Sequence, residues 1–264
     1  MTPLPPVPPK HSLGQNFLID PNIARKLVGA LDPQPDETVL EIGPGVGALT
    51  AVLLERATRV IAVEIDGRLI PGLRERFGEQ LDLLHADILA VDLTELATRA
   101  GGRLALLSCL PYYASSPILF HLLKHRAALS RAVLTLQREV ADRCCAKPGT
   151  KDYGGVSVQL ALAASPRRLF TISPHVFRPR PKVESAALLL DFTRPHPAQP
   201  RSWDALEQVL RAAFGQRRKT LRNALSAKFD FEKTDEMLAA AGVNPKTRAE
   251  DVPPEGFVAL AESV

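Results

Sequence analysis

The sequence predicts an α/β fold, a doubly wound sheet with helices on both faces, followed by a smaller all-helical domain. Two observations support this prediction. From residue 38 onward, short β-rich runs alternate with helical stretches, whereas only helical patterns follow residue 200. A glycine-rich segment, GPGVG, also joins the first β-rich run to the first helical stretch. Such alternation is typical of sheets that bind ligands at the carboxyl ends of their strands.

The elements follow one another in a regular order. The first four β-rich runs and the three helical stretches among them occupy residues 38–42, 48–57, 59–66, 69–77, 81–88, 104–110 and 116–125. Two further runs, 132–136 and 185–192, are also predicted strands. Helical patterns then cover residues 203–214, 218–229 and 232–242, and a last helix starts at about residue 255.

Proline-rich segments divide the chain into domains. Residues 1–10 are predicted to form a mobile, extended tail. Residues 193–200 contain three prolines and no periodic apolar pattern, as expected for a linker. The sequence therefore predicts one domain over residues 11–194 and a helical, RNA-binding domain over residues 195–264.

Composition sets limits on function. The chain has 264 residues and a net charge of +4, which suits a polyanionic partner without requiring one. Its three cysteines, Cys109, Cys144 and Cys145, lack metal-ligand spacing, so we expect no metal and a reducing cytoplasm. The sequence contains neither a signal peptide nor a long apolar run, and a membrane location is not expected. Nothing in it points to an obligate partner, so we expect a monomer.

The glycine-rich turn is the first candidate site. Gly43, Gly45 and Gly47 lie where a strand passes into a helix, and side chains there would block a ligand. A purely structural turn is the alternative. The motif also satisfies the dinucleotide fingerprint, so it does not separate adenosylmethionine from NAD. Glu64, at the end of the next strand, is placed to accept hydrogen bonds from ribose hydroxyls, unless it is a solvated strand end.

Asp87 is the second acidic candidate. It follows the third strand, where a carboxylate can accept a hydrogen bond from the exocyclic amine of adenine. Aspartate at such a position is equally typical of a helix cap.

The segment Cys109-Leu110-Pro111-Tyr112 resolves the ambiguity, because it resembles the N-L-P-Y segment of the adenine-N6 methyltransferases. Further matches are HSLGQNFLID at 11–20, EIGPGVGALT at 41–50, QREVADR at 137–143, FRPRPKVES at 177–185 and QRRKTLRNAL at 216–225. Together they resemble the KsgA-type ribosomal RNA adenine-N6,N6-dimethyltransferases over nearly the whole chain. The resemblance implies a Rossmann-like class I methyltransferase sheet, the cofactor S-adenosyl-L-methionine, and dimethylation of adenine N6 in small-subunit (16S-type) ribosomal RNA during ribosome biogenesis.

The same resemblance assigns roles to individual positions. Tyr112 matches the aromatic residue that stacks on the target base, and Leu110 and Pro111 fall where the family presents a backbone carbonyl to the amine. The residues implied in cofactor binding are Asn16, Leu18, Gly43, Gly45, Glu64, Asp87 and Cys109. These roles fit the chemistry, since the N6 lone pair is delocalised into the ring and has to be oriented by acceptors toward an already reactive methyl group.

One departure concerns the catalytic segment. The family pattern has asparagine where this chain has Cys109, and a thiol is only a weak donor and acceptor. Losing one hydrogen bond costs about 1 to 3 kcal/mol, or about one to two decades of rate. We therefore expect a slow but real enzyme, in which Tyr113 adds a second candidate stacking surface.

Basic residues predict the RNA-binding surface. Phosphate contacts set affinity without reading sequence, and clustered arginines and lysines suit them. The candidates are Phe177, Arg178, Arg180, Lys182, Arg217, Arg218, Lys219 and Arg222. A solvated helix face is the alternative for the last four, and a core contact is the alternative for Phe177.

Three other functions are compatible with parts of the pattern. A ribosome-assembly factor without methyl transfer is suggested by Cys109. A related 23S ribosomal RNA methyltransferase that gives macrolide resistance shares the glycine turn, although the segments at 177–185 and 216–225 favour the small-subunit function. An NAD-linked oxidoreductase has no candidate residue for hydride chemistry.

Overall fold

The computed structural model describes residues 7–10, 13–216 and 218–264, and these fall into two compact units. The first unit contains the described residues up to Ala141 together with Arg167–Thr193. The second contains Asp142–Pro166 together with Arg194–Val264. No helix in the described ranges is long and apolar enough to cross a membrane.

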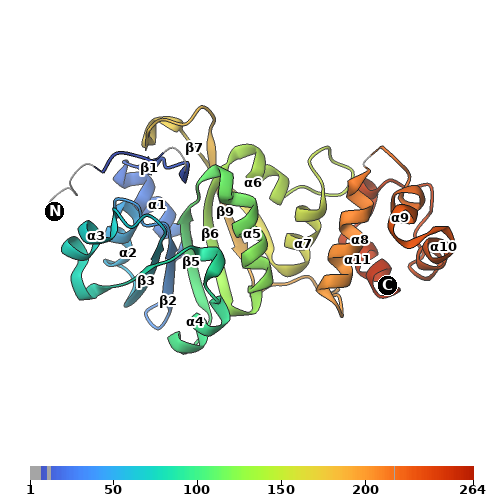
Figure 1. The fold of residues 1–264 in the computed structure, drawn as a ribbon, viewed down its shortest axis with the longest axis horizontal. Coiled ribbons are helices and arrows are strands. Elements are labelled where there is room, and N and C mark those ends of the chain that lie inside the picture. Colours follow the sequence, from blue (N-terminus) through green and yellow to red (C-terminus); the bar gives the residue numbers. More distant parts are fainter. Residues whose placement is uncertain (1–6, 11–12, 217) are drawn as a thin grey trace. The chain divides into compact units, whose positions relative to one another are not determined.

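A seven-stranded sheet forms the centre of the first unit (Figure 1). Its strands, in spatial order, are β4 (Leu81–His85), β3 (Arg59–Glu64), β2 (Thr38–Ile42), β5 (Leu104–Cys109), β6 (Leu129–Gln137), β9 (Ser185–Asp191) and β7 (Ser165–Ile172). Strands β4 to β6 pair in parallel, and β9 is antiparallel to β6. The strand order reverses between β2 and β5, and parallel sheets bind ligands at the carboxyl ends of the strands at such a switch point.

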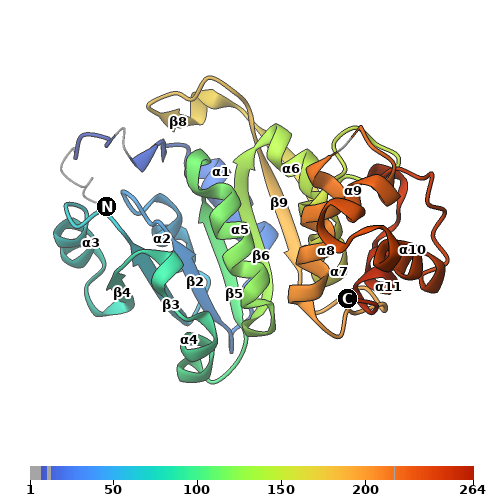
Figure 2. The same ribbon diagram turned by 45° about the vertical axis from the view of Figure 1, so that its right-hand side comes forward.

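Helices cover both faces of this sheet. Helices α1 (Pro21–Leu31), α2 (Ala48–Leu53) and α3 (Ile70–Phe77) contribute to one core together with Val39, Ala62 and Leu107 of the strands. The alternate strand residues, such as Leu40 and Leu106, are equally buried and point to the opposite face. Helix α5 (Ser115–Lys124) lies over β5 and β6 on that face, and α4 (Leu93–Ala100) lies at the lower end of the sheet in Figure 2. Burial on both sides explains why these strands are almost continuously apolar.

A two-stranded sheet holds the amino-terminal segment beside the main sheet. Strand β1 (Phe17–Leu18) pairs antiparallel with β8 (Phe177–Arg178). The described part of the predicted tail is also held, because Val7 packs against the core and the Lys10 backbone N–H donates to Gln15 Oε1 at 2.7 Å. Residues 7–10 therefore differ from the expected mobile tail, while residues 1–6 lie outside the described residues.

The second unit is helical. Helices α7 (Gly155–Ala163), α8 (Trp203–Gly215), α9 (Leu221–Phe229), α10 (Phe231–Ala240) and α11 (Pro254–Ala261) enclose a core of their own. Tyr153, buried in this core, donates its hydroxyl to the Val252 carbonyl at 3.0 Å. Segment 142–166 thus packs with these helices, whereas the sequence analysis had placed it in the 11–194 domain. The apolar residues of helix α7 are spread around the helix, so its sequence does not show which face packs against a neighbouring element.

Shorter elements connect these parts. Helix α6 (Arg138–Cys144) follows β6, and single 3₁₀ turns occupy Gly78–Gln80, Ile88–Ala90, Tyr112–Ala114, Arg126–Ala128, Pro174–Val176 and Ala249–Asp251. The turn at Tyr112–Ala114 leads from the end of β5 into α5, so it brings the predicted catalytic segment to the carboxyl edge of the sheet.

Candidate active site

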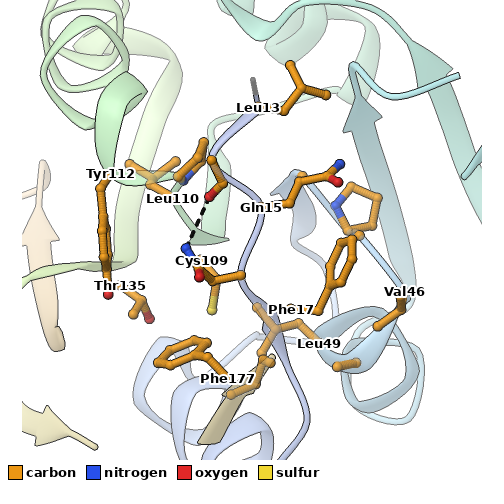
Figure 3. Close-up of a pocket in the computed structure, with 18 of the residues that line it drawn as sticks. Leu13, Gln15, Phe17, Val46, Leu49, Cys109, Leu110, Tyr112, Thr135 and Phe177 are labelled. Atoms are coloured by element: carbon orange, nitrogen blue, oxygen red, sulfur yellow. Dashed lines mark hydrogen bonds between the residues drawn. The ribbon is translucent and has the colours of Figure 1, made fainter. Parts of the chain in front are cut away.

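One pocket at the carboxyl ends of β2, β3, β5 and β6 contains about 860 Å³ of space, part of it open to solvent. It lies within the first unit. Figure 3 shows its walls, with the amino-terminal segment crossing between the end of β5 and the turn after β2. Eleven residues singled out from the sequence line it: Asn16, Leu18, Gly43, Gly45, Glu64, Cys109, Leu110, Pro111, Tyr112, Tyr113 and Phe177. The fold thus gathers residues that are as much as 161 positions apart, which is the separation of residues 16 and 177.

The glycine turn requires its glycines. Gly43, Gly45 and Gly47 have φ angles of 67°, 59° and 79°, a region that side chains with a Cβ rarely adopt. A Cβ on Gly45 would lie 3.0 Å from the ring of Phe17, and a Cβ on Gly47 would lie 2.6 Å from the ring of Phe77. The turn is therefore built for close packing on one side and an open pocket on the other.

Glu64 fixes the position of this turn. Its buried carboxylate accepts from the Gly45 N–H at 3.0 Å and from the Asp66 N–H at 2.8 Å. Burial raises the pKa of Glu64, although these backbone donors oppose the shift. A carboxylate has about four lone-pair sites. Glu64 can therefore hold the turn and still accept from two hydroxyl groups of a ligand.

Asp66 anchors the amino-terminal segment to the pocket wall. It accepts from Gln15 Nε2 at 2.8 Å and pairs with Arg68, whose Nη2 lies 2.6 Å from Asp66 Oδ2. Hydrogen bonding from Arg68 holds the pKa of Asp66 well below its ordinary range. Asp66 is therefore occupied by protein partners and serves to hold Gln15 in place.

Asp87 does not line the pocket. It is exposed, caps the turn Ile88–Ala90 and accepts from the Leu89 N–H at 2.9 Å. The helix-cap alternative describes the observed hydrogen bond, and a contact between Asp87 and adenine stays a prediction. Strand β4 ends at His85, so Asp87 stands two residues beyond the end of the strand.

Glu41 is a buried carboxyl group that the sequence analysis did not single out. Thr50 Oγ1 donates to its Oε2 at 2.7 Å, whereas its Oε1 has no partner among the described residues. Burial raises the pKa of Glu41 to about 8. Because it stands two residues before Gly43, this group lies beneath the glycine turn and is a neutral acid over most of the physiological range.

The end of β5 is fixed to its two neighbouring strands. Ser108 Oγ donates to the Ile42 carbonyl at 2.7 Å, and the Leu110 N–H donates to the Thr135 carbonyl at 3.2 Å. The Pro111 carbonyl accepts from the Ala114 N–H at 3.0 Å and from Ser115 Oγ at 3.2 Å. With Pro111 engaged in this way, the Leu110 carbonyl is the better candidate to receive a substrate amine.

Cys109 and Tyr112 have well-defined surroundings. Burial raises the pKa of the Cys109 thiol to about 12, with a smaller opposing effect of Thr135. The thiol is therefore neutral and is a poor nucleophile. Tyr112 shares a hydrogen bond of 2.8 Å with Ser185, and burial raises the pKa of its phenol. This bond fixes the tilt of the Tyr112 ring along the pocket wall.

Tyr113, the second candidate stacking residue, and Phe177 differ in exposure. Tyr113 is 58% exposed and lies against Gly14, where a Cβ would come within 2.9 Å of its ring. Phe177 is 6% exposed; it packs against the core and also lines the pocket. The core contact that the sequence left open is therefore observed, and contact of Phe177 with RNA stays a prediction.

The predicted RNA-binding residues lie outside the pocket, apart from Phe177. Arg178, Arg180 and Lys182 are exposed in the segment that follows it. Arg218 and Lys219 are exposed just before α9, which Thr220 caps, and Arg217 lies outside the described residues. Arg222 forms two hydrogen bonds with Asp235, at 2.5 and 2.6 Å, and its guanidinium lies 4.8 Å from the centre of the Phe231 ring. Arg222 therefore has a structural role, whether or not it also contacts RNA.

Sequence reasoning missed several pocket residues. Phe17, Thr135 and Ser185 line the pocket, and Gln15 both lines it and binds Asp66. For Thr135 a signal existed, since its strand was predicted and parallel neighbours end at the same edge of a sheet. Within the described part of the chain, no group of three or more His, Cys, Asp or Glu side chains is arranged to hold a metal ion.

Solved structures resemble this fold. A dimethyladenosine transferase from Plasmodium falciparum superimposes with a TM-score of 0.78 at 24% identity, over 92% of this chain and 95% of that one. The 23S rRNA methyltransferase ErmE gives a TM-score of 0.69 at 26% identity, over 94% of this chain and 99% of that one. The sheet order, the glycine turn and these likenesses define a Rossmann-like class I methyltransferase, as the sequence predicted.

Sequence comparison gives the family. Residues 9–264 match the family described as Ribosomal RNA adenine dimethylase. A protein of Salinibacter ruber named Ribosomal RNA small subunit methyltransferase A is 46% identical over 97% of this chain and 85% of its own length. The Geobacillus kaustophilus protein of the same name is 40% identical over 97% of this chain and 90% of its own length. The chain belongs to the ribosomal RNA adenine dimethylase family and is a methyltransferase. This membership excludes the NAD-linked oxidoreductase.

Proposed function

We propose that this methyltransferase uses S-adenosyl-L-methionine to dimethylate adenine N6 in small-subunit ribosomal RNA during ribosome biogenesis. The observation that carries the proposal is the shared pocket of Glu64, the glycine turn and Cys109 to Tyr112. A nucleoside-binding acid and an amine-binding segment then face the same space. We further propose that the protein works as a monomer in the cytoplasm.

The residues at the turn fit the cofactor. Glu64 has lone pairs left for two ribose hydroxyls, and a Cβ placed on Gly43 would meet no atom within 4 Å, so the space beside this residue is open. Val46 and Leu49 supply an apolar wall of the kind that suits an adenine ring. When bound, adenosylmethionine supplies a methyl group on a sulfonium, so that transfer to N6 leaves a neutral thioether and releases one proton to water.

The residues at the end of β5 receive the target adenine. We assign Tyr112 to stacking on the base, because Ser185 holds its phenol and so fixes the ring. The Leu110 carbonyl accepts one N6 hydrogen, which favours a pyramidal nitrogen with its lone pair toward the donor. The pKa of Cys109, at about 12, argues against a covalent role for its thiol.

The RNA contacts follow the exposed basic residues. Arg178, Arg180 and Lys182 leave the pocket wall directly after Phe177, where the backbone flanking an extruded base would pass. Arg218 and Lys219 supply phosphate contacts in the helical unit. Of the two rRNA classes, the small subunit is favoured by the names of the relatives at 46% and 40% identity, compared with 26% for ErmE.

A second candidate is an assembly factor that binds the small-subunit precursor without transferring methyl groups. Cys109 is the observation that favours it, because a thiol is a weak partner for N6.

One experiment tests both candidates. The purified protein is incubated with labelled adenosylmethionine and small ribosomal subunits that lack the modification, and labelled bases are then mapped. We expect label in adenine as N6,N6-dimethyladenine. Binding of adenosylmethionine and of the particles without any incorporation would support the assembly factor, whereas label in large-subunit RNA alone would contradict the small-subunit assignment. NADH serves as the control ligand and should not bind.

A further inference from the structure

A polar side chain that no role above uses lies inside the pocket. Thr135, near the end of β6, is 2% exposed and lines the pocket, and its Oγ1 has no hydrogen-bond partner among the described nitrogen and oxygen atoms. Leaving a buried hydroxyl unpaired costs free energy, so an unpaired one that faces a pocket indicates a ligand group that completes it. The backbone carbonyl of Thr135 is separately occupied by the Leu110 N–H.

Thr135 stands beside the position where the family pattern is broken. In the parallel pairing of β5 and β6, Thr135 is the partner of Cys109. In Figure 3 the side chains of Cys109, Thr135 and Tyr112 lie together on one side of the pocket. The hydroxyl thus faces the space that we assigned to the target base, between the Tyr112 ring and the Leu110 carbonyl.

The two polar side chains differ in what they offer an amine. A thiol accepts hydrogen bonds weakly, whereas a threonine hydroxyl has two acceptor lone pairs and one donor. With its donor turned toward the Cys109 sulfur, the Thr135 hydroxyl keeps its lone pairs for the pocket. A primary amine with two hydrogens can then be held between two acceptors, the Leu110 carbonyl and Thr135 Oγ1.

We propose that Thr135 is a substrate-binding residue whose hydroxyl accepts a hydrogen bond from adenine N6, in place of the side-chain amide that Cys109 lacks. This inference rests on the proposed function. The new element is a group on the neighbouring strand, β6, that orients the amine.

Two substitutions at Thr135 test this role. Thr135→Val removes the hydroxyl at nearly constant shape, and Thr135→Ser keeps it. We expect Thr135→Val to lower the single-turnover methyl-transfer rate by about tenfold to a hundredfold with an unchanged dissociation constant for adenosylmethionine, and Thr135→Ser to restore most of that rate. Ser130→Ala, a change at the opposite end of β6, is the matched control and should leave the rate unchanged.

Unfolding gives a readout that does not depend on activity. If the acceptor lone pairs of the hydroxyl are unsatisfied without substrate, then Thr135→Val keeps or raises the melting temperature, by up to about 4 °C. A hydroxyl that only supports the fold predicts the reverse, with rate and melting temperature falling together. That result would overturn the inference.

A double-mutant cycle with Cys109→Asn links the two positions. If an asparagine amide takes over the amine, Thr135→Val costs less than about threefold in the Cys109→Asn background, compared with tenfold or more in the wild type. Equal costs in both backgrounds contradict the inference. If the wild type methylates adenine but Thr135→Val matches its rate, only the role of Thr135 fails. If the wild type binds adenosylmethionine and modifies no adenine, the proposed function fails as well.

Discussion

Glu64→Gln tests the cofactor-binding end of the pocket with an almost isosteric change. The carboxylate accepts from the Gly45 and Asp66 N–H groups, at 3.0 and 2.8 Å. Glutamine has one acceptor oxygen, so one of these donors faces an NH₂ group and loses its partner. A hydrogen bond to a charged group contributes about 1.5 to 3 kcal/mol. Because burial of the charge at Glu64 offsets part of this, we expect a loss of about 1 to 2 kcal/mol in the free energy of unfolding.

Glu64→Gln should also weaken the binding of adenosylmethionine. The single remaining oxygen is shared between the glycine turn and the ribose, so at least one ribose hydrogen bond is lost. We therefore expect the dissociation constant of adenosylmethionine to rise by about tenfold to a hundredfold, measured by titration calorimetry. Glu37→Gln is the control: it removes one of the two 2.6 Å hydrogen bonds that Arg131 donates to Glu37 outside the pocket, so it should lower stability and leave cofactor affinity unchanged. Wild-type affinity in Glu64→Gln would refute the assignment of Glu64 to the ribose.

Three further predictions concern the buried acid beneath the glycine turn, the turn itself and the pocket wall at Cys109. Because burial raises the pKa of Glu41 from 4.5 to about 8, the folded protein keeps a proton that the unfolded chain releases. The free energy of unfolding should then fall as the pH rises from 4.5 to about 8. In Glu41→Gln this fall should be smaller by a few kcal/mol, as measured by denaturant titrations at pH 5 and pH 8. Gly47→Ala, with its Cβ 2.6 Å from Phe77 and a φ of 79°, should lower stability by about 1 to 3 kcal/mol, whereas Gly29→Ala, which meets nothing within 4 Å, should not. Cys109→Asn should raise the single-turnover rate, by less than about tenfold if Thr135 already orients the amine, and no gain would count against an amine-binding role at position 109.

The sheet was largely predictable because its strands leave strong local signals. The runs at 38–42 and 185–192 lie within one residue of β2 and β9, and the glycine turn follows from backbone constraints that only glycine meets easily. Strand β7 was not predicted. It has charged and exposed positions, such as Arg167 and Arg168, so neither an apolar run nor a clear alternation marks it.

The pocket was predictable only in part, for a physical reason. Motif residues such as Gly43 and Glu64 lie at the ends of strands where the chain turns, so their positions follow from local sequence. Thr135 and Ser185 enter the pocket through strand pairing, and the pairing of β6 with β5 and β9 is a tertiary property. Asp87 shows the opposite situation: a short-range cap hydrogen bond to the Leu89 N–H defines its observed position, while the long-range contact expected for it stays a prediction.

The most direct test is a crystal structure with S-adenosylhomocysteine and adenosine monophosphate bound together. We expect the cofactor ribose on Glu64, the second adenine stacked on Tyr112, and its N6 within hydrogen-bond distance of the Leu110 carbonyl. A cofactor seated away from the glycine turn, or an adenine amine pointing away from the end of β5, would contradict this expectation.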